Sequence, residues 1–331
     1  MPSCSASAKS SNPSTSEGAV TASTTPLALD WVAADWGTSS LRVWAIGADG
    51  SVLDKASSDK GMGKIGKADY EPTLLELIGQ WIEGVTGPIP VIVCGMAGAR
   101  QGWTEAAYRT VPCAPVSVDE LTRVDTADTR LSVSIVPGLC QMKPEDVMRG
   151  EETQLAGLLA GNIAENAAIC LPGTHSKWVS LEGGSVARFS SVMTGELFAL
   201  IGGQSILRHS IGGTTDREPG STFLNAANQA LADPASLTAS LFSIRARSLL
   251  AEASPEDGSD TLSGLLIGTE IAACRPFWEG RPVHLIGAGP LVARYAAALQ
   301  QAGVEAIVED GSGLTLAGLA QVRAGMKEFT P

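Results

Sequence analysis

Apolar and polar positions follow one another along this chain in a pattern that occurs twice. An apolar run at 29–34 is followed by a polar turn, a second run at 41–46, an Asp-Gly turn and a third run at 51–56. Apolar runs of this length with turn residues between them predict a three-stranded antiparallel meander. The same unit recurs at 167–189, and both polar turns contain Gly-Thr-x-Ser. We therefore predict two similar α/β halves that face each other.

Further strands and helices are predicted between and after the two meanders. A continuous apolar run at 89–94 is followed by a glycine, which is typical of a strand buried in a parallel sheet. Apolar runs at 283–286 and 304–309 predict two more strands in the second half. Apolar spacing predicts helices at 73–82, 146–160, 197–207, 234–252, 290–301 and 313–325.

The length of the chain favours two domains. It has 331 residues, and single hydrophobic cores stop growing at roughly 250–300 residues. We expect domains at 27–160 and 161–331, with a ligand cleft between them. Residues 1–26 are rich in Ser and Thr and lack the apolar core of a secretory signal, so we expect a disordered tail there.

Composition narrows the range of partners. The formal net charge of -12 argues against nucleic acid, because phosphate-backbone binding needs clustered Lys and Arg. No apolar run reaches the ~18 residues of a membrane span, so no membrane partner is expected. The six cysteines have no Cys-x-x-Cys spacing, which disfavours a metal cluster or disulfide framework and favours the cytoplasm. The oligomeric state stays open, with a homodimer possible.

A glycine-rich loop at 287–289 follows one of the predicted strands and precedes a helix. Together with two acids about 20 residues later, this arrangement is typical of a dinucleotide fingerprint. Val292 replaces the third glycine, and too few residues follow Asp310 to complete a Rossmann domain. An NAD-dependent oxidoreductase therefore stays an alternative. In either case the two glycines let the backbone approach a flat or anionic ligand closely.

Two adjacent carboxylates and one arginine are further candidates for chemistry. Glu151 and Glu152 lie in the predicted helix at 146–160, where acids either complement the helix dipole or act as a general base for a hydroxyl. Arg100 lies in a Gly/Ala-rich loop after the strand at 89–94. Loops at the ends of parallel strands hold ligands, and Arg suits a carboxylate. A surface salt bridge is the other interpretation of Arg100.

The two polar turns and the late glycine loop together resemble the sugar-kinase branch of the superfamily of actin, hexokinase and heat-shock chaperone ATPases. In that family a "phosphate 1" hairpin reads D-x-G-T-[ST]-S, and residues 35–40 here read Asp-Trp-Gly-Thr-Ser-Ser. A "phosphate 2" hairpin opens the second half, and residues 171–178 read Leu-Pro-Gly-Thr-His-Ser-Lys-Trp. The "adenosine" loop comes late, as at 287–289. The resemblance covers about 27–325 and implies two ribonuclease-H-like (actin-like ATPase) domains.

Four stretches considered together look more specifically like the 2-dehydro-3-deoxygalactonokinases. They are Asp-Trp-Gly-Thr-Ser-Ser-Leu-Arg at 35–42, Gly-Glu-Glu-Thr-Gln at 150–154, the turn at 171–178, and Met-Thr-Gly-Glu-Leu-Phe at 193–198. The resemblance implies an ATP- and Mg²⁺-dependent kinase that phosphorylates the 6-hydroxyl of 2-dehydro-3-deoxy-D-galactonate in galactonate catabolism. A nucleotide-switch ATPase of the same superfamily that phosphorylates no sugar is the other alternative.

The resemblance also implies roles for individual residues. Asp35 would hold Mg²⁺, and Glu151 or Glu152 would be the base, with Glu151 preferred because it directly follows Gly150. The ATP phosphates would be bound by Gly37, Thr38, Ser39, Gly173, Thr174, His175 and Ser176. Adenosine would be bound by Gly287, Ala288 and Gly289. The candidates for binding the anionic sugar are Arg100, Arg42, Met96 and Lys177, of which Arg42 and Lys177 could instead contact the ATP phosphates.

Overall fold

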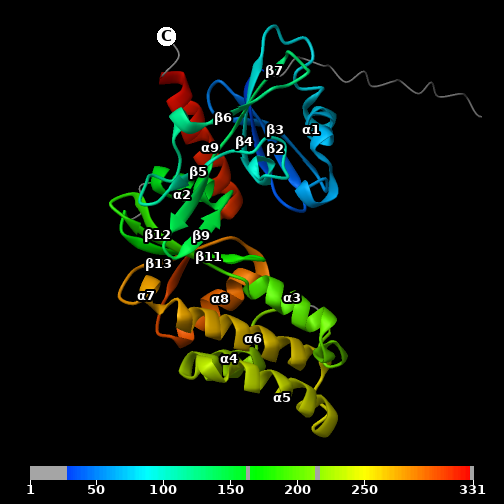
Figure 1. Cartoon of the computed structure of the whole chain (residues 1–331), viewed down its shortest axis with the longest axis vertical. Helices are drawn as coiled ribbons and strands as arrows, with labels where there is room; N and C mark the ends of the chain where they lie inside the picture. Colours follow the sequence, from blue (N-terminus) through cyan, green and yellow to red (C-terminus); the bar gives the residue numbers. More distant parts are fainter. Residues whose placement is uncertain (1–27, 162–164, 213–216, 329–331) are drawn as a thin grey trace, which may run out of the picture.

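The computed structural model describes residues 28–161, 165–212 and 217–328. The tail predicted at 1–26 lies outside the described residues. Two β-sheets form the framework of the part that is described (Figure 1). Each sheet is covered by helices whose positions determine where the predicted site residues lie.

The two sheets share the order of five strands, and the first sheet has a sixth, antiparallel strand at its edge. The first sheet runs β3 (Val52–Ser58), β2 (Leu41–Gly47), β1 (Leu29–Trp36), β4 (Ile89–Gly95), β7 (Leu131–Ile135) and β6 (Thr122–Val124). The second runs β12 (Ser185–Val192), β11 (Ser176–Glu182), β10 (Ala167–Leu171), β13 (Val283–Ile286) and β14 (Ala306–Glu309). In each, three antiparallel strands continue into two parallel ones. This shared order confirms the predicted pair of ribonuclease-H-like folds.

Nine α-helices are present in the described ranges. They are α1 (Tyr70–Ile78), α2 (Glu151–Ala160), α3 (Thr194–Gln204), α4 (Ser221–Ala232), α5 (Leu237–Leu250), α6 (Pro255–Ala273), α7 (Arg275–Trp278), α8 (Gly289–Gln301) and α9 (Gly311–Glu328). The predicted helix at 146–160 is wrong in its first turn. Residues 145–148 form the strand β9, and α2 begins only at Glu151, because Gly150 has a φ of +106° that no helix contains.

Several elements were not predicted from the sequence. A small third sheet contains β5 (Tyr108–Thr110), β8 (Gly138–Met142) and β9 (Glu145–Met148). Helices α4 and α6 pack so closely that a Cβ on Gly264 would lie 2.4 Å from the Phe223 carbonyl oxygen. Because α6 is buried along most of its length, it lacks the one-sided apolar stripe from which a surface helix is predicted.

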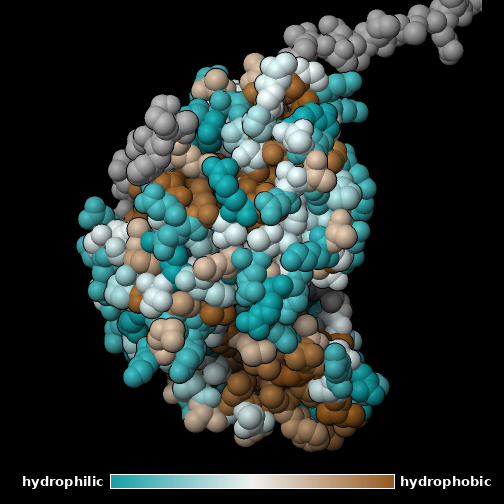
Figure 2. Space-filling model, turned by 45° about the horizontal axis from the view of Figure 1, so that its top comes forward, coloured by the Kyte–Doolittle hydropathy of each residue, from teal (hydrophilic) through white to brown (hydrophobic). Residues whose placement is uncertain are grey.

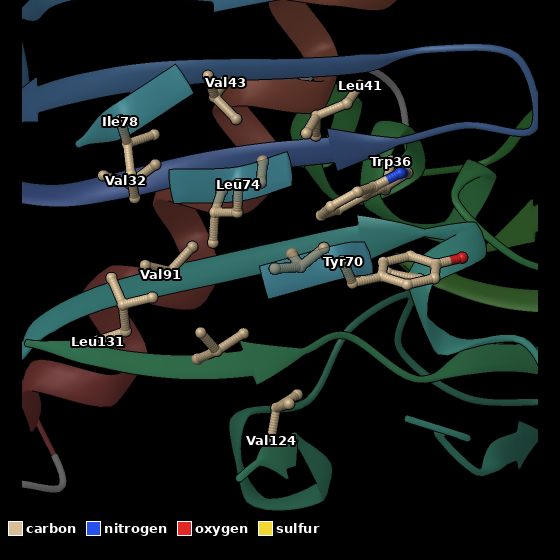
Figure 3. Close-up of a cluster of buried hydrophobic side chains, with 14 of the residues drawn as sticks. Val32, Trp36, Leu41, Val43, Tyr70, Leu74, Ile78, Val91, Val124 and Leu131 are labelled. Atoms are coloured by element: carbon tan, nitrogen blue, oxygen red, sulfur yellow. The ribbon is translucent and has the colours of Figure 1, made fainter. Parts of the chain in front are cut away.

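Strand β1 presents alternate residues to two different cores. Val32, Ala34 and Trp36 pack toward α1, where the Trp36 and Tyr70 ring centroids lie 4.6 Å apart (Figure 3). Trp31 and Ala33 pack on the other face, against α9. Since side chains alternate along a strand, Asp35 belongs to the face that is covered by α9.

Each half of the chain contributes a helix to the sheet of the other half. Leu319 of α9 packs against the first sheet, whereas Leu155 of α2 packs against the second. The two helices touch closely, since a Cβ on Gly157 would lie 2.0 Å from the Leu314 carbonyl oxygen. Figure 1 shows α9 rising from the second half along the first sheet. The domain boundary at residue 160 stays a prediction. The two halves exchange α2 and α9 across it.

The surface, the cysteines and the character of the helices add three observations. Apolar side chains are exposed on α3 and α5, among them Leu200, Phe242 and Leu249, and Figure 2 shows apolar surface at that end of the molecule. The cysteines in the described ranges are free thiols. None of the helices described here is both long and apolar enough to cross a bilayer.

Candidate active site

A cleft of about 480 Å³ is lined by both polar hairpins. From the first half come Asp35, the turn at 37–38 and Glu151, and from the second half come the turn at 173–175 and Lys177. The predicted site residues that line it are Asp35, Gly37, Thr38, Met96, Glu151, Gly173, Thr174, His175, Lys177 and Gly287. The tertiary structure therefore brings together residues that are more than 200 positions apart in the chain.

A second cavity, of about 420 Å³, shares Gly173 and Thr174 with the cleft. Its walls are largely apolar and come from α3, α6 and the start of α8, including Phe198, Leu266 and Leu291. Ala288 lines it. Gly287 and Gly289, on either side of Ala288, have φ values of +147° and +74°, which residues with a Cβ rarely adopt. The predicted adenosine loop thus lies where the two cavities meet.

Asp35 and Arg42 form an ion pair across neighbouring strands. The two residues are direct partners in the register of β1 and β2, and the Arg42 Nη2 atom donates to Asp35 Oδ2. Arg42 Nη1 also donates to Ser312 Oγ at 2.6 Å, at the start of α9. Arg42 is not part of the cleft lining. Its contacts orient the Asp35 carboxylate, which does line the cleft.

The two adjacent carboxylates at the start of α2 point in different directions. Glu151 lines the cleft, accepts a hydrogen bond from the Arg149 backbone N–H at 3.0 Å, and has Oε1 3.5 Å from Lys177 Nζ. Glu152 is fully buried and accepts from the Gly150 N–H at 2.6 Å. Burial raises the pKa of Glu152 to about 8, and the negative charge of Glu151 adds to this shift. Successive helical residues are about 100° apart, so one acid faces the cleft and the next faces the core.

Besides Arg42, Glu152 and the loop residues Ala288 and Gly289, three more predicted site residues do not line the cleft. The Arg100 side chain is 82% exposed and pairs with Glu105, because the chain turns at Met96–Gly98 and directs Met96, rather than Arg100, into the cleft. The prediction that Arg100 contacts substrate therefore has no support in the geometry. Ser39 is exposed beside the lining residues of its turn. Ser176 is fully buried, and its hydroxyl faces Glu270 and Tyr295 instead of the cleft.

Arg149 is a cleft residue that was missed in the sequence. Its guanidinium group stacks on the Tyr108 ring at 4.4 Å, and Nη2 donates to the Ala106 carbonyl oxygen at 2.7 Å. Its Nε and Nη1 atoms are buried without a hydrogen-bond partner, and no carboxylate pairs with it among the residues that the structure describes. In the sequence, Arg149 could have been identified as a candidate by its position directly before Gly150 and the two acids. An arginine without an anionic partner is suited to binding an anion.

Comparison with known proteins gives one family. The sequence profile of the 2-keto-3-deoxy-galactonokinase family matches residues 35–322. A probable 2-dehydro-3-deoxygalactonokinase of Rhizobium meliloti is 41% identical over 88% of this chain and 95% of its own length. The 2-dehydro-3-deoxygalactonokinase of Escherichia coli is 34% identical over 88% of this chain and 97% of its own length.

A solved structure shows the same likeness in three dimensions. A crystal structure from Sinorhizobium meliloti, assigned to a 2-dehydro-3-deoxygalactonokinase, superposes with a TM-score of 0.82. It is 38% identical and covers 91% of this chain and 98% of that chain. These matches confirm the resemblance seen in the motifs. The chain belongs to the 2-keto-3-deoxy-galactonokinase family.

Proposed function

We propose that the protein transfers the γ-phosphoryl group of ATP to the 6-hydroxyl of 2-dehydro-3-deoxy-D-galactonate, a step of galactonate catabolism. The single observation that carries the proposal is that two Gly-Thr turns line one cleft together with Asp35 and Glu151. The family to which the chain belongs supports this reaction. A dinucleotide-dependent oxidation has no comparable support.

ATP would span the two cavities. Its adenosine fits the apolar cavity beside Ala288 and Leu291, and its phosphates would lie between the turns at 37–39 and 173–175. Tight polar turns expose several backbone N–H groups at once, and these groups bind phosphate oxygens without a basic surface. This mode of binding suits a chain with a net charge of -12.

Asp35 has the chemistry expected of a Mg²⁺ ligand in this setting. Mg²⁺ prefers oxygen ligands and usually takes one or two carboxylates, with phosphate oxygens and water completing its shell. The Asp35 carboxylate lines the cleft beside the turn at 37–38. No cluster of three or more metal-ligating side chains occurs in the described ranges, which suits an ion that arrives with the nucleotide. When bound, Mg²⁺ would offset charge on the phosphates.

Glu151 is the base in this proposal. The 6-hydroxyl oxygen forms the new bond to the γ-phosphorus, the bond to the bridging oxygen of ADP breaks, and Glu151 accepts the hydroxyl proton. Lys177 Nζ, 3.5 Å away, orients the carboxylate. Glu152 is unsuited to this role because it is fully buried and its raised pKa, about 8, keeps it mostly protonated at neutral pH.

The carboxylate of the sugar acid would be bound by Arg149. This residue lines the same cleft as Glu151 and Met96, and its guanidinium group lacks an anionic partner among the described residues. Lys177 also lines the cleft, but it already lies beside Glu151. Arg149 therefore replaces Arg100 as the residue proposed to bind the substrate carboxylate.

A coupled ADP-release assay tests the proposed reaction. Purified protein with ATP and Mg²⁺ is offered a panel of 2-keto-3-deoxy sugar acids that includes the galactonate and gluconate derivatives. ADP should appear only with a sugar acid present, and fastest with the galactonate derivative. ATP hydrolysis that is independent of every sugar acid would instead support the nucleotide-switch ATPase. The cytoplasmic location and the homodimer stay predictions, and light scattering after gel filtration tests the latter.

A further inference from the structure

A carboxylate that lines neither cavity is the hub of a buried hydrogen-bond network. Glu270 of α6 is 2% exposed, and its Oε1 accepts from Trp178 Nε1 at 2.8 Å. Its Oε2 accepts from the Tyr295 hydroxyl at 2.6 Å and from Ser176 Oγ at 3.2 Å. Thr194 is a further side-chain hydrogen-bond partner. Four side chains from three different elements therefore converge on one carboxylate.

The network accounts for how this acid can be buried. Burial alone raises the pKa of Glu270, and the hydrogen bonds from Thr194, Tyr295, Trp178 and Ser176 counteract part of that rise. A buried carboxylate is tolerated only when its oxygens are well supplied with donors. The positions of the donors are thus tied to the position of Glu270.

Three of the four donors lie in the wall of a cavity or directly beside one. Ser176 directly follows the turn at 173–175, which lines both the cleft and, through Gly173 and Thr174, the second cavity. Thr194 at the start of α3 and Tyr295 of α8 line the second cavity. Glu270 therefore connects the turn proposed to bind phosphate with two walls of the cavity proposed to bind adenosine. Trp178, the fourth donor, lines neither cavity.

We propose that Glu270 is a positioning residue for the nucleotide. Its carboxylate fixes the turn at 173–175 relative to α3 and α8, and so sets the distance between the phosphate and adenosine ends of the site. It acts on nucleotide affinity without touching the nucleotide. The inference rests on one part of the proposed function, which is that these two cavities bind ATP and ADP.

The first test is Glu270→Gln, measured by calorimetric titration with ADP and Mg²⁺. The amide places an N–H₂ group against at least one of the donors, in either orientation of the side chain. Loss of a hydrogen bond to a charged group corresponds to about a tenfold or larger change, so the ADP dissociation constant should rise by about that factor. The KM for ATP should rise in parallel, while the KM for the sugar acid stays within about twofold.

Two partner variants separate positioning from general stability. Ser176→Ala removes the donor that follows the phosphate turn and should weaken ADP binding severalfold. Trp178→Phe removes a donor to the same carboxylate from a residue that neither lines a cavity nor directly follows the phosphate turn. It should therefore lower the melting temperature and leave ADP affinity within about twofold. If both variants weaken ADP equally for the same loss of melting temperature, the role is merely structural and the proposal is overturned.

Other outcomes are equally decisive. A folded Glu270→Gln protein that binds ADP like wild type contradicts the proposal. If Glu270→Gln does not fold, the contrast between Ser176→Ala and Trp178→Phe decides the question. Titration with ADP needs no sugar acid, so a wild-type protein that binds ADP but turns over no sugar acid refutes the proposed reaction and leaves this inference testable. A wild-type protein that binds no nucleotide refutes both.

Discussion

Glu151 and Lys177 meet across the cleft from opposite halves of the chain, with Lys177 Nζ 3.5 Å from Glu151 Oε1. Glu151 begins α2, and Lys177 lies in β11 directly after the buried Ser176. The proposed base is therefore oriented by a residue of the other half. Any change in the relative position of the halves would change this contact, which couples the arrangement of the halves to the proposed chemistry.

Replacing the proposed base tests its assignment. Glu151→Gln should lower kcat by about 10²–10⁴-fold, the range that general base catalysis contributes, and leave ADP affinity within about twofold. Glu152→Gln is the matched control, because an amide imitates the protonated form of a buried acid whose pKa is about 8. Its kcat at pH 7 should stay within about threefold of wild type. The opposite ranking of the two variants would assign the base to Glu152.

The raised pKa of Glu152 predicts a dependence of stability on pH. Between the ordinary pKa of a glutamate, 4.5, and its raised value, about 8, the folded protein holds a proton that the unfolded chain releases. The contribution of Glu152 to the free energy of unfolding is therefore complete below the ordinary pKa of a glutamate. It is lost as the pH rises toward 8, by at most about 1.4 kcal/mol per pH unit.

Urea unfolding at pH 5.5 and pH 8 measures this effect. The free energy of unfolding of wild type should fall more between the two pH values than that of Glu152→Gln, which carries no titrating proton at this position. Parallel behaviour of the two proteins would mean that Glu152 ionises normally in the folded state.

Asp35→Asn should remove the contribution of Mg²⁺ to nucleotide binding. In wild type, ADP should bind more tightly in the presence of Mg²⁺ than in the presence of a chelator. In the variant this difference should disappear, together with turnover, because an amide is a poorer ligand for the ion than a carboxylate. Asp59→Asn makes the same chemical change at an exposed side chain that pairs with Lys64, and it should behave like wild type. A Mg²⁺ effect that survives in Asp35→Asn contradicts the metal assignment.

Arg149→Met should weaken binding of the sugar acid specifically. Loss of charge-assisted hydrogen bonds to a carboxylate predicts a rise of roughly 10- to 100-fold in the sugar-acid KM, with the KM for ATP nearly unchanged. Arg100→Met is the control, since that side chain is exposed and pairs with Glu105. Steady-state kinetics with each substrate varied in turn checks both. A larger effect in Arg100→Met would restore the interpretation made from the sequence.

Close packing of α4 against α6 predicts a loss of stability in Gly264→Ala. The added Cβ would lie 2.4 Å from a backbone oxygen of α4, and overpacking of this kind lowers the free energy of unfolding by about 1–3 kcal/mol. Gly203→Ala in α3 is the matched control, because a Cβ there meets no atom within 4 Å. It should leave stability unchanged or raise it by up to about 1 kcal/mol. Chemical denaturation of both variants measures the contrast.

The sequence by itself determined the duplicated fold and the two turns of the cleft. The meanders at 29–56 and 167–189 were legible because strand pairing there is local and turn residues separate the strands. The family, too, followed from short motifs whose residues are consecutive in the chain. The acid pair at 151–152 was found in the same way, without any means of choosing between its members.

Only the tertiary structure decided which side chains face the cleft. The start of α2 after Gly150 directs Glu151 to the cleft and Glu152 to the core, and the turn at Met96–Gly98 turns Arg100 to solvent. Helices α4 and α6, the buried hydroxyl of Ser176 and the network around Glu270 were likewise invisible in the sequence. Such features depend on contacts between residues far apart in the chain, and apolar periodicity and local motifs carry no record of those contacts.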